Sequence, residues 1–146
     1  FEHYPWQWFP PQEYAWYVDR LGITPDGAFV ENGEKGPDGM VVGLFTLEKA
    51  NAVCNAITKP NTEQLFRWKV APLEASQHLM TFNSNMYKKQ GWAVGQYVWS
   101  PTLYPHEGKY MAISFEIRDI GSLDYPSELN YVACVRDFRA TGDILV

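Results

Sequence analysis

The sequence predicts an α+β fold, because two helical patterns occupy the middle of the chain and alternating strand patterns follow them. A length of 146 residues and a hydrophobic content of 46% are enough for one domain with a real core. The sequence shows neither internal repeats nor low-complexity tracts. We therefore expect a single domain over residues 1–146, of which residues 1–45 form an aromatic- and turn-rich N-terminal part.

The N-terminal part is crowded with aromatic side chains and interrupted by prolines, so one long helix cannot cover it. We expect short extended pieces on either side of Pro10-Pro11. An edge strand or a short turn of helix is expected from Tyr14 to Val18. Turn signals follow at Pro25-Asp-Gly, Asn32-Gly and Pro37-Asp-Gly. A small strand, Ala28–Val30, fits between them.

Two helices are expected in the middle of the chain. Thr46 is a good N-cap, and apolar residues at helical spacing follow it until Pro60 ends the pattern. Pro72 suits the first turn of a second helix. The buried stripe of that helix would consist of Ala75, Leu79 and Phe82.

Strand patterns follow Phe82. Trp92–Trp99 is a first candidate, and Tyr110–Ile117 is the clearest, because its apolar residues alternate with Ala112, Ser114 and Glu116. Tyr131–Val135 is apolar on both faces, which is typical of a central strand. The stretch from Ile117 to Asn130 is expected to be a loop.

Charge and hydropathy argue against two classes of partner. The formal net charge is −5, and the sequence lacks the basic stripe that nucleic-acid binders usually present. No apolar run reaches the roughly 18 residues that a membrane span requires, so we expect no membrane insertion. The first residues lack the charged and apolar regions of a signal peptide. We therefore interpret the chain as a mature fragment or as a domain of something longer.

The only two cysteines, Cys54 and Cys134, fall in the first helical pattern and in the last strand pattern. A bridge between them would close a loop of roughly 80 residues and contribute on the order of 4 kcal/mol in the chain-entropy model. Free thiols in the core of a cytosolic protein are the alternative, since unpaired cysteine is commonly buried. The placement favours an extracytoplasmic recognition domain over an enzyme.

Four motifs stand in order along residues 46–136. They are Thr46-Leu47-x-x-Ala50-x-x-Val53-Cys54, Trp68-Lys69-Val70 running to Leu79, Val98-Trp99-Ser100-Pro101-Thr102, and Val132-Ala133-Cys134-Val135-Arg136. In this order they resemble a bacterial group of C-type-lectin-like domains, found at the end of collagen-like adhesins and in related surface proteins. The resemblance implies two helices packed on a small twisted antiparallel sheet with long loops, core positions for Trp68 and Trp99, and a disulfide from Cys54 to Cys134.

The chain departs from the family pattern at two places. The Leu-Pro-Thr-x-x-Glu-Leu core of the second motif is degraded to Val70-Ala71-Pro72-Leu73-Glu74-Ala75-Ser76, and Ser100 is followed by a proline instead of a second serine. Calcium-dependent lectins of the wider superfamily carry Glu-Pro-Asn or Gln-Pro-Asp and later Trp-Asn-Asp, triplets that this chain lacks. Only about 16 residues, Asn83 to Val98, are left for a long calcium-carrying loop. We expect no calcium site of that type, no other metal site and no cofactor.

The resemblance implies a non-catalytic recognition domain that binds a glycan or a cell-surface protein. Such an adhesin or receptor-binding tip would be exported through the periplasm and exposed outside the cell, as part of a larger fibre or pilus protein. The alternative is a structural module of a pilus or fibre, with the aromatic N-terminal segment as its joint. Because Gly-x-Ser-x-Gly, His-Glu-x-x-His and Gly-x-x-x-x-Gly-Lys are all absent, an unrecognised hydrolase is only a third hypothesis, and we expect no enzyme.

Candidate ligand-binding residues come from three regions, 84–97, 103–109 and 119–129, because loops on a rigid scaffold carry function. Aromatic side chains would stack on the ligand and polar ones would hydrogen-bond to it, without calcium. The candidates are Trp92, Tyr97, Tyr104, His106, Glu107, Asp124 and Tyr125. A solvated turn is the alternative for residues 104–108, and surface solvation is the alternative to calcium binding for Asp119, Asp124 and Glu128.

Overall fold

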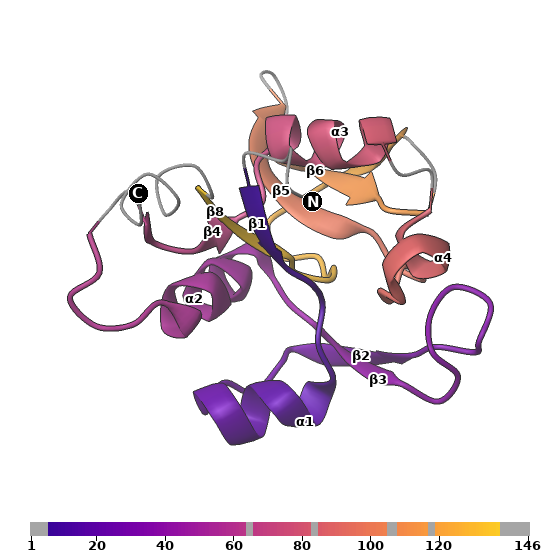
Figure 1. Cartoon of the computed structure of the whole chain (residues 1–146), viewed down its shortest axis with the longest axis horizontal. Coiled ribbons are helices and arrows are strands. Elements are labelled where there is room, and N and C mark those ends of the chain that lie inside the picture. Colours follow the sequence, from indigo (N-terminus) through magenta and orange to yellow (C-terminus); the bar gives the residue numbers. More distant parts are fainter. Residues whose placement is uncertain (1–5, 64–65, 83–84, 105–107, 117–118, 138–146) are drawn as a thin grey trace.

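The computed structural model describes residues 6–63, 66–82, 85–104, 108–116 and 119–137. Its elements, in chain order, are β1 Trp6–Phe9, α1 Tyr14–Trp16, the π-helical turn η1 Tyr17–Leu21, β2 Gly27–Val30, β3 Val41–Leu44, α2 Leu47–Ile57, β4 Lys69–Val70, α3 Leu73–Phe82, α4 Met86–Gln90, β5 Val98–Tyr104, β6 Lys109–Ser114, β7 Asp119–Asp124 and β8 Cys134–Asp137 (Figure 1). Helices and small antiparallel sheets alternate along the chain, in agreement with the predicted α+β class.

The first and last strands of the described chain share one small sheet, in the order β1–β8–β4 (Figure 1). Cys134 in β8 pairs with Phe9 of β1 on one side and with Val70 of β4 on the other. The prediction of a central strand at this point is confirmed, since apolar residues face both sides. The strand begins three residues later than predicted, because Tyr131 instead forms an isolated parallel bridge with Val98.

A second sheet is the meander β5–β6–β7. Its central strand β6 ends at Ser114, short of the predicted end at Ile117. Ala112 and Ser114, which alternate in sequence with the apolar residues of β6, are both buried. The third sheet is the two-stranded ribbon β2–β3, of which only β2 was expected.

The two predicted long helices are confirmed. The Thr46 hydroxyl caps α2 by accepting from Lys49 N at 3.4 Å, and α2 ends at Ile57, shortly before Pro60. Helix α3 begins directly after Pro72, whose carbonyl accepts from the first-turn backbone N–H groups. Of the predicted stripe on α3, Ala75 and Leu79 are buried, whereas the side chain of Phe82 lies outside the described residues. Over the described ranges, the helices are too short or too polar to cross a membrane.

Three sequence expectations are wrong. The chain does not turn to strands after Phe82, because Asn85 caps a further helix, α4, by accepting from Lys88 N at 3.1 Å. The predicted strand Trp92–Trp99 is replaced by β5 from Val98, since the preceding backbone bonds to the 31–40 loop instead of a ladder. The stretch expected as a loop contains β7. Strands β1 to β3 precede α2, and of these β1 and β2 agree with the expected extended piece and small strand.

The N-terminal part contributes both of its expected kinds of structure. An extended piece forms β1, and of the two alternatives for Tyr14 to Val18 the helical one is correct, as α1 and η1. Gly22 ends η1 with a φ of 67°, a conformation that glycine adopts without steric cost. Helix α1 packs on β3 at the opposite end of the molecule from α3 (Figure 1).

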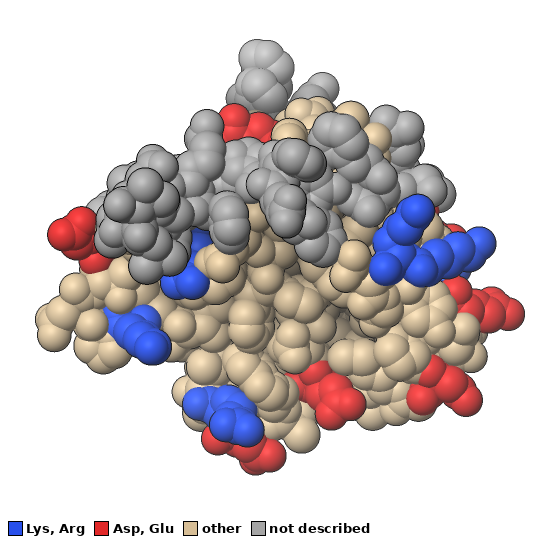
Figure 2. All heavy atoms as spheres, viewed as in Figure 1, with Lys and Arg blue, Asp and Glu red and all other residues tan. Residues whose placement is uncertain are grey.

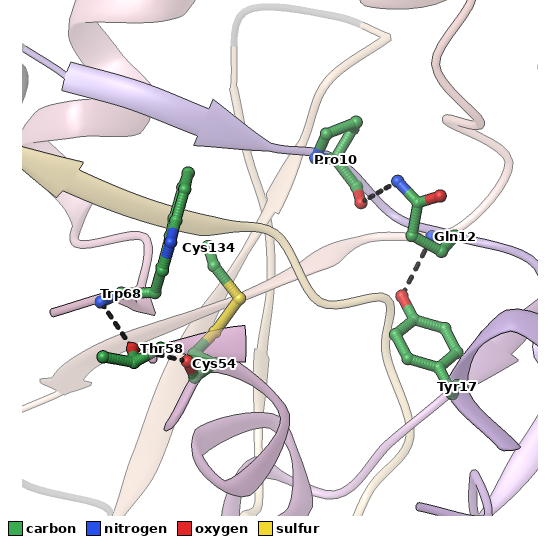
Figure 3. Close-up of a disulfide and its surroundings, with 7 residues drawn as sticks. All are labelled: Pro10, Gln12, Tyr17, Cys54, Thr58, Trp68 and Cys134. Carbon is green, nitrogen blue, oxygen red and sulfur yellow. Dashed lines mark hydrogen bonds between the residues drawn. A yellow bond between two sulfur atoms is a disulfide. The ribbon is translucent and has the colours of Figure 1, made fainter. Parts of the chain in front are cut away.

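The Cys54–Cys134 disulfide is present and joins α2 to β8, with a Cα–Cα distance of 5.6 Å (Figure 3). Beside it, the Thr58 hydroxyl donates to the carbonyl of Cys54 at 3.3 Å and accepts from Trp68 N at 2.9 Å. Trp99 is fully buried in the same hydrophobic cluster, and its indole N–H donates to the carbonyl of Phe45. Its predicted core position is therefore confirmed.

Trp68 is only half-buried, although it packs against this cluster. The guanidinium of Arg136 lies 4.9 Å from the centre of its ring, and the ring of Phe9 meets it edge-on at 5.9 Å. Phe9 of β1, Trp68 directly before β4 and Arg136 of β8 thus pack together beside the disulfide cluster.

We expect loss of the disulfide to lower the free energy of unfolding by on the order of 4 kcal/mol. The bond joins residues 80 positions apart, and without it the unfolded chain gains the conformational entropy of an open loop. Urea unfolding of the Cys54→Ser/Cys134→Ser double variant, followed by tryptophan fluorescence, measures this change. The control is the same double variant with added reductant, which should not change further. Identical unfolding curves for the oxidised and reduced native protein would contradict the prediction.

Candidate functional site

A hollow of about 470 Å³ opens between the 31–40 loop, the segment that precedes β5 and the end of β6. Small-molecule sites in proteins commonly have volumes of roughly 300–1,000 Å³, so the hollow is large enough for a ligand. The residues that line it are Lys35, Val94, Gly95, Gln96, Tyr97, Ser114 and Glu116. Of the seven candidates predicted from sequence, Tyr97 alone is among them.

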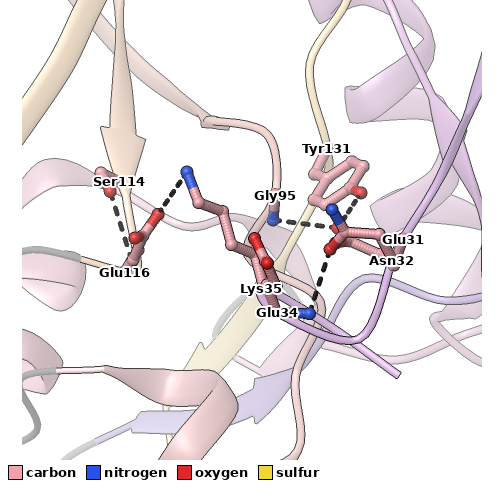
Figure 4. A network of polar contacts seen from close by, with 8 residues as sticks. All are labelled: Glu31, Asn32, Glu34, Lys35, Gly95, Ser114, Glu116 and Tyr131. Atoms are coloured by element: carbon pink, nitrogen blue, oxygen red, sulfur yellow. Dashed lines mark hydrogen bonds and ion pairs between the residues drawn. The ribbon is translucent and has the colours of Figure 1, made fainter. Parts of the chain in front are cut away.

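The polar side of the hollow contains an ion pair. Lys35 Nζ lies 3.2 Å from Glu116 Oε2, and the two side chains are 51% and 32% exposed (Figure 4). The Ser114 hydroxyl accepts from Glu116 N at 3.2 Å, which fixes the backbone that carries the carboxylate. Such an exposed pair stabilises a fold by only about 0–1 kcal/mol. Its charges are therefore available for contacts with a ligand.

The aromatic side of the hollow is Tyr97, whose side chain is exposed. Its carbonyl accepts from Tyr131 N at 2.9 Å, so the backbone beneath the ring is fixed. Gln96 also lines the hollow; it is half-buried and supplies a carboxamide that can donate and accept hydrogen bonds. The hollow thus combines an aromatic ring with charged and neutral hydrogen-bond donors and acceptors.

The buried carboxylate of Glu31 holds the two walls of the hollow together (Figure 4). Its Oε1 accepts from the Tyr131 hydroxyl at 2.5 Å and from Gly95 N at 2.9 Å. A Cβ on Gly36 or Gly95 would lie 2.6 or 2.5 Å from Glu31 side-chain atoms, so both positions require glycine. A buried carboxylate without hydrogen-bond partners is costly. The loop that carries Glu31 and Lys35 is therefore held where Glu31 keeps both of its donors.

The tyrosine that donates to Glu31 keeps its proton well above neutral pH. Burial raises the pKa of the Tyr131 hydroxyl above its ordinary value, and the hydrogen bond to Glu31 and that carboxylate's charge raise it further. Burial also raises the pKa of Tyr17, an effect that the backbone hydrogen bond from Gln12 only partly offsets. Both hydroxyls are therefore protonated donors or acceptors throughout the neutral range.

Two other predicted candidates, Asp124 and Tyr125, lie at the opposite end of the β5–β6–β7 sheet. There the register aligns Tyr104 with Lys109, and Tyr110 with Asp124. Asp124 Oδ2 accepts from the side-chain amide of Asn130 at 2.8 Å. Tyr125 is exposed, and Lys109 Nζ lies 5.0 Å from the centre of its ring. The seven residues of β5 separate this end from the hollow by roughly 20 Å, at about 3.3 Å per residue.

Of the remaining predicted candidates, Trp92 lies in neither place, and the side chains of the other three are not described. Trp92 is half-buried and packs against the core, with its ring 5.9 Å from that of Trp8 and 6.0 Å from that of Phe115. The side chain of Tyr104 lies outside the described residues, as do His106 and Glu107, which fall in the connection between β5 and β6. The structure therefore separates the sequence-predicted site into a hollow, a hairpin end and a core residue.

Five residues of the hollow and its support were missed from sequence, namely Glu31, Lys35, Gln96, Ser114 and Glu116. They belong to three separate stretches of chain that only the tertiary fold brings together. The one local signal was the Asn32-Gly turn directly after Glu31. A turn of this type shows where a loop begins, but it does not show that the preceding carboxylate is buried.

Charged side chains do not form a single-sign field on the face shown in Figure 2, where small groups of Lys and Arg alternate with Asp and Glu. Among the residues that the structure describes, His, Cys, Asp and Glu side chains do not come together in a group of three or more that could hold a metal ion. We therefore take the polar lining of the hollow as the candidate site.

Comparisons of the chain with protein-family models, with curated proteins and with solved structures found no match. The function is accordingly argued from the geometry of the site.

We expect Glu31→Ala to lower the free energy of unfolding by roughly 2 kcal/mol or more, because the Tyr131 hydroxyl and Gly95 N–H lose their buried partner. Glu31→Gln should cost less, since its amide oxygen can accept from both donors. The matched control is Glu34→Ala on the same loop, where an exposed side chain changes stability by less than about 0.5 kcal/mol. Urea unfolding of the three variants measures the differences, and equal effects of Glu31→Ala and Glu34→Ala would contradict the prediction.

We expect the free energy of unfolding to decrease as pH rises above about 10, where tyrosines of the unfolded chain begin to lose their protons. The raised pKa values of Tyr17 and Tyr131 keep both protonated in the folded state. The stability they contribute is fully present below pH 10 and is lost at up to about 1.4 kcal/mol per pH unit for each tyrosine. Urea unfolding between neutral pH and pH 11 measures the slope. Tyr131→Phe should make it shallower, and an unchanged slope in that variant would contradict the assignment.

Proposed function

We propose that the chain is a non-catalytic recognition domain of C-type-lectin-like fold that binds a glycan or a cell-surface protein without calcium. The observation that carries this proposal is the hollow at Tyr97, which offers an exposed ring beside the Lys35–Glu116 ion pair. Aromatic rings with a few convergent polar groups are the usual composition of recognition sites. The absence of the calcium-binding triplets from the sequence supports recognition by direct contacts.

The fold and location in this proposal are supported by the disulfide. It ties the first long helix to the last described strand, which is the pairing that the resemblance to C-type-lectin-like domains implies. Structural disulfides persist in oxidising compartments and are rare in the cytosol. A buried disulfide of this kind is compatible with a domain displayed outside the cell, in an adhesin or receptor-binding tip.

The absence of catalysis is proposed from the chemistry of the hollow. Its lining offers a serine, but the neighbouring carboxylate is paired with Lys35, and the Ser114 hydroxyl accepts from Glu116 N. An acyl-transfer site needs a nucleophile beside a base that is itself oriented by a third group. We therefore assign the polar groups of the hollow to binding.

Recognition is proposed ahead of the assembly alternative for a structural reason. The aromatic segment that would serve as the joint contributes β1, which pairs along its whole length with β8. Trp8 packs on the core, and Phe9 packs on the disulfide cluster. A variant without residues 1–18 would lose β1 and with it part of a sheet. Loss of assembly in such a variant could therefore not be distinguished from loss of folding.

Binding of the purified, oxidised domain to a glycan array and to immobilised envelope extracts tests the proposal. We expect saturable binding that is lost when the protein is unfolded and is unchanged by a calcium chelator, because the contacts are direct. Binding only in the presence of calcium would contradict the mechanism. An array and extracts without signal at concentrations that detect weak lectins would contradict the function.

A further inference from the structure

We propose that the hollow binds an uncharged, hydroxyl-rich saccharide unit, held between the Tyr97 ring and the Lys35–Glu116 ion pair. This inference rests on the proposed function and narrows the ligand to one chemical class and one end of the β5–β6–β7 sheet. It also assigns roles to two residues, Lys35 and Glu116, that the sequence did not indicate as ligand-binding.

The charge balance of the hollow selects against charged ligands. Lys35 and Glu116 lie 3.2 Å apart and compensate each other, so the lining carries no net charge among its seven residues. An anionic ligand would meet the Glu116 carboxylate without a surplus cation, and a cationic ligand would meet Lys35 in the same way. Like charges brought together in a binding site disfavour the wrong ligand.

The arrangement of donors and acceptors favours hydroxyl groups. A hydroxyl donates one hydrogen bond and accepts others, so two neighbouring hydroxyls can donate to the Glu116 carboxylate and accept from the Lys35 ammonium at once. Hydrogen bonds to charged groups are stronger than those between neutral groups. The Gln96 carboxamide supplies a further donor and acceptor in the lining of the hollow.

The exposed ring of Tyr97 gives the hollow an apolar wall. A saccharide ring has a face of C–H groups that can pack on an aromatic ring, and aromatic side chains bring contact area at low entropic cost. The Tyr97 side chain is 40% exposed while its backbone is bonded to Tyr131, so the ring is accessible on a fixed support.

The site is organised before a ligand arrives. Glu31 bonds the segment next to Tyr97 through Gly95 N, and Val94 N donates to the carbonyl of Lys35 at 2.6 Å. The loop that carries Lys35 and the segment that carries Tyr97 are therefore joined at two points. A pre-formed site avoids part of the ordering cost of binding, which matters for a small neutral ligand with few contacts.

The hairpin end of the sheet is the competing location. There Lys109 lies over the exposed ring of Tyr125, and Asp124 accepts from Asn130. The aromatic face at that end is covered by a cation of the protein itself. Among the described residues, no Lys or Arg is found over the ring of Tyr97. The ammonium of Lys35 is directed to Glu116 instead (Figure 4).

Titration of the ¹⁵N-labelled domain with a panel of methyl pyranosides tests the inference by NMR. The panel contains neutral methyl hexosides and N-acetylhexosaminides, their uronate counterparts, sialic acid and glucosamine. We expect saturable shifts of the backbone signals of Gly95, Gln96 and Tyr97 with a neutral sugar, and binding of the matching uronate that is at least about tenfold weaker. No shift at these signals with any neutral sugar, or equal affinity for the uronate, would overturn the inference.

Charge variants provide a readout that a merely structural role would not move. Glu116→Gln leaves Lys35 uncompensated, so preference should move toward the uronate by about tenfold or more. Lys35→Met leaves Glu116 uncompensated and should move preference toward glucosamine. An unchanged order of affinities in both folded variants would overturn the assignment of the pair.

Aromatic variants locate the site. Tyr97→Ala should weaken neutral-sugar binding by about tenfold or more, whereas Tyr97→Phe should retain most of it, because stacking needs the ring. Tyr125→Ala is the matched control at the other end of the sheet and should bind as the native protein does. Loss of binding in Tyr125→Ala with full retention in Tyr97→Ala would overturn the inference.

Failure of this inference can be told from failure of the proposed function. If the domain binds an array or envelope extract and Tyr97→Ala binds equally well, the hollow is wrong while recognition stands. If the array, the extracts and the titration all give no signal, both are wrong. Thermal unfolding of each variant confirms that its fold is intact before binding is compared.

Discussion

One covalent tie organises the described chain, the disulfide between Cys54 in α2 and Cys134 in β8 (Figure 3). Because β8 is the central strand between β1 and β4, this bond fixes a helix to the sheet in which the first and last described strands pair. Both sulfurs are buried among aromatic and aliphatic side chains. The helix, the sheet and the aromatic N-terminal segment therefore share one hydrophobic cluster, to which Trp99 of β5 also belongs.

A second constraint, at Glu31, connects this framework to the candidate site. Tyr131 forms the parallel bridge with Val98 of β5, and its hydroxyl donates to the Glu31 carboxylate. The same carboxylate accepts from Gly95, next to the exposed ring of Tyr97. A buried acid with two donors thus places a surface loop, which carries Lys35, against the edge of a sheet. The chemistry of the hollow follows from that placement, since the ion pair and the ring come from distant parts of the sequence.

Local signals in the sequence were sufficient for some elements and insufficient for others, for physical reasons. A cap at Thr46 and a stop at Pro60 define α2 by themselves, and an apolar pattern on both faces identifies the strand at Cys134. In contrast, Asn85 caps a helix of only five residues, too short for a hydrophobic period to show. The burial of Glu31 depends on partners 64 and 100 residues away, which no local pattern can indicate.

The proposed fold and location both depend on the Cys54–Cys134 disulfide. Mass spectrometry of proteolytic peptides prepared without reductant is the direct test of this bond. We expect one linked pair of peptides, one containing Cys54 and the other Cys134, that separates into two peptides after reduction. Detection of both cysteines as free thiols in the folded protein would contradict this bond, and the proposed C-type-lectin-like fold and proposed extracellular location would then lose their main support.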